Sequence, residues 1–160
     1  MNASINSSSR QRPMSSAGFT LIELMVTIAV LAIIVSIAAP NISTQLANQR
    51  VKSTTATLVN ALKEAKVESV IRRQSLEFSF DDGSHSMVII SKNANSDEVA
   101  SYSYNAKNII KADKASITFH PSKRTDTVVF NICDSKNSSA TMQVVVTAAA
   151  NISTAAGGTC

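Results

Sequence analysis

The stretch GFTLIELMVTI (residues 18–28) begins the longest apolar segment of the chain and decides how the rest is interpreted. From Phe19 to Ala39 there are 21 residues, and Glu23 is the only charged one. A helix rises about 1.5 Å per residue, so this segment would span about 30 Å, enough to cross a bilayer core. A charged side chain in lipid costs roughly 2.5–3.5 kcal/mol. A segment that served only as an anchor would therefore be better without Glu23.

The residues before this segment have the composition of a targeting leader. Residues 1–18 are polar, rich in Ser and Asn, and carry Arg10 and Arg12. Two arginines on the N-terminal side of the apolar segment predict, by the positive-inside rule, that the N-terminus is cytoplasmic and that most of the chain lies on the other side of the membrane. A start at Met14 would remove both arginines, and Met1 is therefore the preferred start.

The apolar segment is expected to stay in the processed protein. An ordinary secretory signal ends its apolar run with a small-residue cleavage site. Here Ala38-Ala39-Pro40 is a poor site, because Pro40 would follow the cut, and the Gly18-Phe19 junction comes before the apolar run.

The pattern GFTLIELMV after a short basic leader resembles the N-terminal signature of type IV pilins and of type II secretion pseudopilins. The resemblance implies that a membrane-embedded prepilin peptidase cuts between Gly18 and Phe19 and methylates the new N-terminus at Phe19. It also implies that Glu23 is a carboxylate needed for assembly, and Pro40 matches a helix-kinking proline of that family. Independently, a carboxylate near a helix N-terminus is stabilised by the helix dipole. It could pair with the N-terminal ammonium of a neighbouring subunit; the alternative is that Glu23 only reaches to the membrane interface.

After Pro40 the chain is predicted to remain helical to about residue 73. Val51, Leu58, Leu62 and Ala65 recur on one face of such a helix, and most charged residues lie off that face. We therefore expect one long helix over residues 19–73, with a membrane half (19–39) and an amphipathic half (40–73).

From Leu76 the period changes from helical to alternating. Residues 76–80 and 87–90 flank the turn Asp81-Asp82-Gly83-Ser84 and predict a hairpin. Further short strands are expected at 99–104, 109–110, 116–120, 127–132 and 142–147, about six or seven in all. The predicted fold is α+β, in which a long N-terminal helical spine packs on an antiparallel, sandwich-like β head over residues 74–160.

The two cysteines lie in the predicted head, and an exported head favours a disulfide over two free thiols. Cys133 ends a predicted strand and Cys160 is the last residue. A bond between them would fix the tail from Ala148 to Thr159, which is too small and polar to hold itself in place.

Nothing in the sequence indicates an enzyme. No cysteine, histidine and acidic residues stand at metal-ligand spacing, and there is no phosphate-binding glycine loop. His85 and His120 are expected on the surface. No catalytic residue, metal or cofactor is predicted.

The strand-rich C-terminal half resembles the GspH/FimT-type group of minor pilins and pseudopilins, and the paired cysteines favour the FimU-type minor pilins within it. This resemblance implies a minor pilin of the bacterial inner membrane, with a periplasmic head, that joins an initiating or tip complex of a type IV pilus. The implied partners are the prepilin peptidase, other minor pilins, the major pilin and inner-membrane lipid. A type II secretion pseudopilin is an alternative that differs in its partners.

DNA binding for natural transformation is the other alternative, and the charge argues against it. The chain carries 15 basic and 11 acidic residues, and removing residues 1–18 reduces the basic excess to two. The tail from Thr147 to Cys160 contains no Lys or Arg, and phosphate contacts need cations. Lys123 and Arg124 on a predicted turn, together with Lys107, Lys111 and Lys114, are the remaining candidates for a DNA patch, and a solvated surface is the preferred interpretation.

Overall fold

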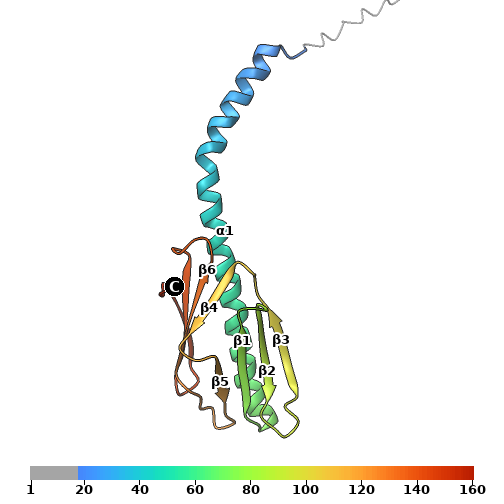
Figure 1. Cartoon of the computed structure of the whole chain (residues 1–160), viewed down its shortest axis with the longest axis vertical. Coiled ribbons are helices and arrows are strands. Elements are labelled where there is room, and N and C mark those ends of the chain that lie inside the picture. The colour runs from blue at the N-terminus through green and yellow to red at the C-terminus, as the bar shows by residue number, and fades with distance from the viewer. Residues whose placement is uncertain (1–17) are drawn as a thin grey trace, which may run out of the picture. The chain divides into compact units, whose positions relative to one another are not determined.

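The computed structural model describes residues 18–160, and for residues 38–41 it describes the helical backbone but not the side chains. The chain divides into two compact units, Met1–Ala39 and Pro40–Cys160. One helix, α1 (Leu21–Arg72), runs through both units, and all the strands lie in the second, which we call the head (Figure 1). The eight strands are β1 (Leu76–Asp81), β2 (Ser86–Ser91), β3 (Glu98–Ser103), β4 (Asn108–Ala112), β5 (Ser116–Phe119), β6 (Val128–Asp134), β7 (Thr141–Val146) and β8 (Ile152–Ala156).

The long helix predicted over residues 19–73 is confirmed as α1, and its C-terminus has a recognisable cap. Arg73 takes a left-handed conformation with φ 54°. The amide of Gln74 then donates to the carbonyl of Ser69 over 3.2 Å, which is the long bond of a Schellman motif. The cap closes the helix and turns the chain into β1.

No single helix among the described residues is both long and apolar enough to span a membrane. The helical stretches Leu21–Ile37 and Ile42–Arg72 meet the length and hydropathy requirement only when they are taken together.

The strands form two antiparallel sheets with the orders β3-β2-β1-β5 and β4-β6-β7-β8. Rings from both sheets meet in the core: Phe78 and Phe80 of β1 contact Phe130 of β6 edge to face, with centroid distances of 6.1 and 6.0 Å. Edge-to-face pairs of this kind add to the stabilisation from burial. The sandwich-like head predicted from alternation is confirmed.

The amphipathic half of α1 packs into the same core. The four residues predicted to form its apolar stripe, Val51, Leu58, Leu62 and Ala65, are all buried. Ala47, Ala61 and the hydroxyl residues Thr54, Thr55 and Ser69 are buried on the same side. Small residues in this face allow the helix backbone to approach the sheets closely.

The hairpin predicted at residues 76–90 is confirmed, and its turn is held by one aspartate. The Asp81 carboxylate accepts hydrogen bonds from the hydroxyl of Ser84 at 2.7 Å and from the amide of Gly83 at 3.0 Å. These bonds lower the pKa of Asp81 below its usual value. The sequence cue, turn residues between two alternating runs, therefore has a direct physical counterpart.

Two expectations about the head were wrong. The tail from Ala148 to Thr159 is not held only at its end, because β8 forms within it and pairs with β7 from Ile152 to Ala156. His85, expected on the surface, is half-buried with its ring against Tyr104 at 5.5 Å. His120 is exposed, as expected.

Candidate assembly site

The first turn of α1 is closed by an N-cap at Thr20. The Thr20 hydroxyl accepts the amide hydrogen of Glu23 at 3.3 Å, and the Thr20 carbonyl accepts that of Leu24 at 3.2 Å. Thr is among the residues preferred at a helix N-cap, and its position just before the apolar run is the available sequence signal. Glu23 therefore lies in the first turn, where the helix dipole favours a negative charge.

The rest of this helical stretch satisfies its own polar groups. The Thr27 and Ser36 hydroxyls donate to the carbonyls of Leu24 and Ile33, each over 2.8 Å. Its large apolar side chains, from Phe19 to Ile37, are each at least half exposed. Within residues 19–37 the Glu23 carboxylate is the one polar side-chain group with no hydrogen-bond or ion-pair partner.

The two residues at the predicted cleavage junction are accessible. Gly18 and Phe19 are exposed, and Phe19 is 80% accessible. A Cβ added at Gly18 would meet no atom within 4 Å. The side chain of Pro40, the proline matched to the family's kink, lies outside the described residues.

A buried ion pair fastens α1 to the head. Arg50 donates from Nε and Nη2 to Oδ2 of Asp134 at 2.9 and 2.8 Å, and the Asp134 side chain has no exposed surface. Its other oxygen accepts the amides of Lys136 and Asn137, each at 3.1 Å. Burial opposes ionisation of Asp134, but these hydrogen bonds and the nearby guanidinium outweigh burial, so its pKa lies below the usual value.

Asn108 extends this connection at the start of β4. Its fully buried side chain donates from Nδ2 to the carbonyl of Arg50 at 2.8 Å and to the hydroxyl of Thr54 at 2.6 Å. The sequence analysis singled out none of these residues. The available signal was a pair of polar residues, Arg50 and Thr54, on the same side of the helix as Ala47, Val51 and Leu58.

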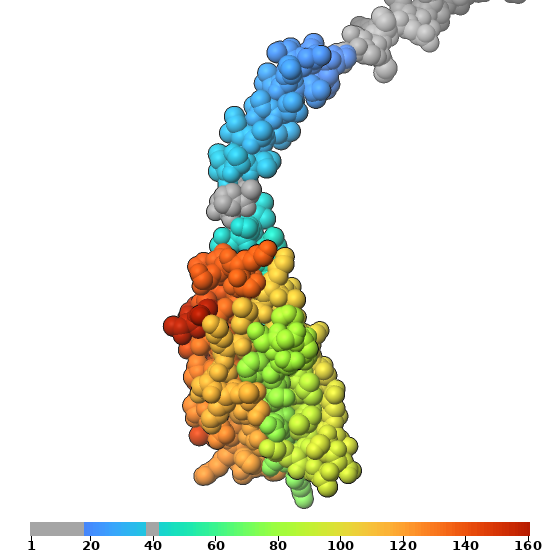
Figure 2. Space-filling model, in the orientation of Figure 1, coloured from blue at the N-terminus to red at the C-terminus, as the bar shows by residue number. Residues whose placement is uncertain are grey.

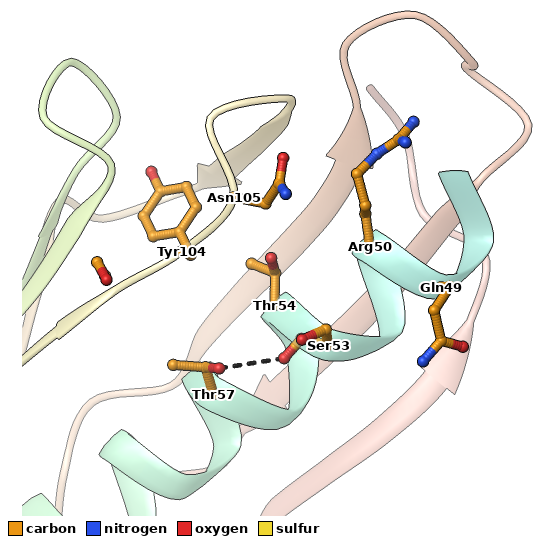
Figure 3. A pocket seen from close by; sticks show the side chains of 8 residues that line it. Gln49, Arg50, Ser53, Thr54, Thr57, Tyr104 and Asn105 are labelled. Carbon is orange, nitrogen blue, oxygen red and sulfur yellow. Dashed lines mark hydrogen bonds between the residues drawn. The ribbon is translucent and has the colours of Figure 1, made fainter. Parts of the chain in front are cut away.

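A polar hollow opens beside these contacts, between α1 and the segment that follows β3 (Figure 3). Gln49, Arg50 and Thr54 lie on the helix side, and Tyr104 and Asn105 lie opposite. The lining offers hydroxyl and amide groups but no nucleophile with an adjacent base. Among residues 18–160 there is no group of three or more His, Cys, Asp or Glu side chains arranged to hold a metal ion.

The predicted disulfide is present between Cys133 and Cys160. After β8 the chain crosses the sheet towards β6, and Gly158, at φ 126°, passes so close to Asn131 that a Cβ would lie 2.6 Å from Asn131 Oδ1. Lys111 of β4 donates to the Cys160 carbonyl oxygen at 2.8 Å. Residues 157–160 thus form a strap fastened to both β6 and β4.

The predicted basic residues Lys123 and Arg124 lie on the β5–β6 connection, next to the end of α1. The hydroxyl of Ser75 is 3.0 Å from His120 Nδ1, which links the chain after α1 to this connection. In Figure 2 the two segments lie at the same end of the head. Of the described acidic side chains, none lies within 4 Å of Arg73, Lys123 or Arg124, whereas Lys114 is paired with Asp126 at 3.3 Å.

A capped apolar helix that continues into a two-sheet head is the architecture of type IV pilin-like proteins, which this chain resembles in fold. The sequence matches the prokaryotic N-terminal methylation motif over residues 13–39. A comparison with curated protein sequences finds no significant match.

Solved structures with this fold include proteins from two bacteria. The type IV minor pilin FimU of Pseudomonas aeruginosa matches in two crystal forms, with TM-scores of 0.56 and 0.57 and identities of 15% and 16%. These matches cover 65% and 66% of this chain and 91% and 87% of FimU. The minor pseudopilin EpsH from the type 2 secretion system of Vibrio cholerae matches with a TM-score of 0.58 and 8% identity, covering 67% of this chain and 97% of EpsH. The likeness to this minor pilin and this minor pseudopilin is one of fold.

Proposed function

We propose that this chain is a minor pilin, a structural subunit that takes part in initiating a type IV pilus or in a tip complex. Prepilin peptidase cuts between Gly18 and Phe19 and methylates Phe19. Residues 19–39 anchor the subunit in the bacterial inner membrane with the head in the periplasm. The subunit then joins other minor pilins and the major pilin in the filament.

The unpaired Glu23 carboxylate is the observation that carries this proposal. In the proposed membrane anchor an unpartnered charge is costly in lipid, so it is retained where a partner arrives later. The proposed cleavage creates a new N-terminal ammonium group at Phe19, and in the proposed filament the N-terminus of one subunit lies beside Glu23 of the next. Pairing between subunits therefore gives the carboxylate the partner that its own chain lacks.

The surroundings of Gly18 give a second argument for the proposed processing step. A Cβ added at Gly18 would meet no atom within 4 Å, so packing makes no demand for a small residue there. A peptidase that must accept the chain on both sides of the scissile bond does make such a demand.

A type II secretion pseudopilin is the second candidate, and the likeness to the EpsH head favours it. The two candidates share processing, anchoring and the role of Glu23, and differ in the filament that is built. Deleting the gene and scoring both pili and secreted proteins separates them: loss of pili with normal secretion supports the minor pilin, and the reverse supports the pseudopilin.

Mass spectrometry of the protein purified from membranes tests the shared part of the proposal. The N-terminal peptide is expected to begin at Phe19 and to carry one added methyl group. Gly18→Trp is expected to leave residues 1–18 attached without lowering the stability of the head, because nothing packs on Gly18. A wild-type protein that retains its leader would contradict the proposed function.

A further inference from the structure

β8 is the outermost strand of its sheet, and one side of its backbone is open. It pairs with β7 in five consecutive positions, from Met142↔Ala156 to Val146↔Ile152, without a register shift. At the two ends of this ladder Thr147 donates to Asn151 at 3.0 Å and Gly157 donates to Thr141 at 3.2 Å. Hydrogen-bonded positions alternate along antiparallel strands. The peptide groups of Ile152, Thr154 and Ala156 therefore point away from β7.

The other edge strands carry features that prevent edge-to-edge pairing. Proteins blunt their edges with charges, bulges, prolines or short strands. The β3 edge begins with Glu98, and its pairing with β2 shifts register at Ile89/Ile90. The β4 edge carries Lys111, and β5 has four residues and ends shortly before Pro121. The β8 sequence, Ile-Ser-Thr-Ala-Ala, contains none of these features.

Two surface hollows lie between β8 and α1, one at each end of the strand. Near Ile152 the helix contributes Lys63, Lys66 and Val67, and near Ala156 it contributes Asn48, Val51 and Lys52. Val67 is 53% exposed. Three lysines and no acidic residue line these hollows, so their charge is positive.

We propose that the open edge of β8 binds an extended strand of a neighbouring pilin-type subunit, with acidic residues beside Lys52 and Lys63. The added strand would run antiparallel to β8 and pair with the peptide groups of Ile152, Thr154 and Ala156. Strand addition of this kind obtains affinity from main-chain hydrogen bonds and specificity from side-chain pockets. The inference rests on the proposed function, since it takes its partner from the same filament.

The geometry favours a different edge strand over a second β8. Because Ile152 lies beside Lys63 and Ala156 beside Lys52, β8 runs antiparallel to α1. Two β8 strands paired antiparallel would point their α1 helices in opposite directions. In the proposed filament all subunits point the same way along the filament axis, so their α1 helices are parallel. A β8 edge on such a subunit must therefore pair with a strand that runs in the direction of α1.

Proline at position 154 tests this edge specifically. Thr154 has its N–H on the open side, so Thr154→Pro removes a donor for the partner and leaves the β7 ladder intact. The matched variant Ser153→Pro removes a donor to β7 and is expected to destabilise the head. Thr154→Lys places a charge on the edge without changing the backbone, and it is the second test if the proline variant does not fold.

The readout is photocrosslinking in cells that make the full-length protein, with a photoreactive residue at Ala156 and, as a control, at the exposed Ser101 of β3. We expect Ala156 to crosslink to an acidic strand of another subunit that carries its own N-terminal methylation motif, and Ser101 not to do so. Thr154→Pro or Thr154→Lys should reduce the crosslink at least tenfold.

Three outcomes would overturn the proposal: no crosslink from Ala156, a crosslink only between two copies of this chain, or a crosslink that the folded Thr154 variants leave unchanged. The N-terminus of the same samples distinguishes this failure from failure of the proposed function. If Phe19 is methylated and the filament forms, the result contradicts only the proposed binding at the β8 edge, and the proposed function stands.

Discussion

Glu23 has two physical roles that overlap, and a pair of substitutions separates them. Its amide is held by Thr20 in the first turn of α1, and its carboxylate has no partner within residues 19–37. The cap uses the backbone amide of Glu23 and not its carboxylate, so Glu23→Gln keeps the cap and removes the charge. Thr20→Ala removes the cap at a cost of about 1 kcal/mol and keeps the charge.

We predict that Glu23→Gln abolishes filament assembly while the protein stays in the membrane at wild-type levels. Thr20→Ala should reduce assembly only slightly, because the helix continues far beyond its first turn. Counting filaments by electron microscopy and quantifying the membrane fraction measure both effects. Normal assembly with Glu23→Gln, together with loss of assembly in Thr20→Ala, would show that assembly needs the helix cap and not the Glu23 charge.

The Arg50–Asp134 pair is the strongest residue-scale connection between α1 and the sheets. Removing one partner of a buried pair leaves the other unpaired and typically costs 3–5 kcal/mol. Arg50 keeps partial access to water, with 23% of its side chain exposed, so Asp134→Ala is expected to cost about 3 kcal/mol in the free energy of unfolding. In the exposed Lys114–Asp126 pair, Asp126→Ala should cost less than about 1 kcal/mol.

This pair also sets a pH dependence whose sign follows from the lowered pKa of Asp134. The folded-state pKa lies below that of the unfolded chain, about 3.9. The stabilisation is therefore present in full above about pH 5 and is lost as pH falls through the folded-state pKa. Denaturant unfolding should show the wild type and Asp134→Ala becoming closer in stability below about pH 4. A constant difference down to pH 2 would contradict the assignment.

At the scale of elements, periodicity alone was enough to predict most of the head. α1 was predictable because Val51, Leu58, Leu62 and Ala65 repeat with a helical period, and the hairpin because β1 and β2 flank a turn rich in Asp, Gly and Ser. β8 was missed because its residues are small and nearly all exposed, so they show no alternation. Backbone hydrogen bonds to β7 hold β8 in place. Such bonds do not depend on the type of side chain, so the amino-acid sequence does not reveal them.

The residues described under the candidate assembly site also fall into two groups, those recognisable from the sequence and those that only the fold brings together. The cleavage junction and Glu23 are recognisable because they follow one another in the chain. Arg50, Asn108 and Asp134 are far apart in the sequence and are brought together only by packing of α1 on β4 and β6. A single polar residue on an apolar helix face does not identify its partner.

The presence of β8 changes what loss of the disulfide should do. The bond joins residues 27 positions apart, and the chain-entropy account gives it roughly 3–4 kcal/mol. We predict this loss in the free energy of unfolding for Cys133→Ala/Cys160→Ala, measured by denaturant titration. Hydrogen exchange should show residues 157–160 losing protection while the amides of Ser153 and Ala155 keep theirs. Exchange throughout Ala148–Thr159 would instead show that the disulfide alone holds the tail.

At the scale of the whole molecule, the distribution of charge bears on DNA uptake. The unpaired cations Arg73, Lys123 and Arg124 share one end of the head, and the tail from Thr147 to Cys160 carries no charged residue. Non-specific binding to duplex DNA depends on the number of phosphates neutralised, and each contributes about 0.9 to the slope of log affinity against log salt. Three cations would give a slope of about −3, well below the 6–10 contacts of strong binders.

We therefore predict that the protein does not retain duplex DNA at physiological salt, and that weak binding at low salt falls with a slope of about −3. Lys123→Ala/Arg124→Ala should reduce that slope by about 2. Lys107→Ala/Lys136→Ala, which removes two basic residues elsewhere on the head, should not change it. Fluorescence anisotropy of a labelled duplex, titrated at several salt concentrations, measures both quantities. Tight binding at physiological salt that depends on Lys123 and Arg124 would overturn this prediction and make DNA a partner of this end of the head.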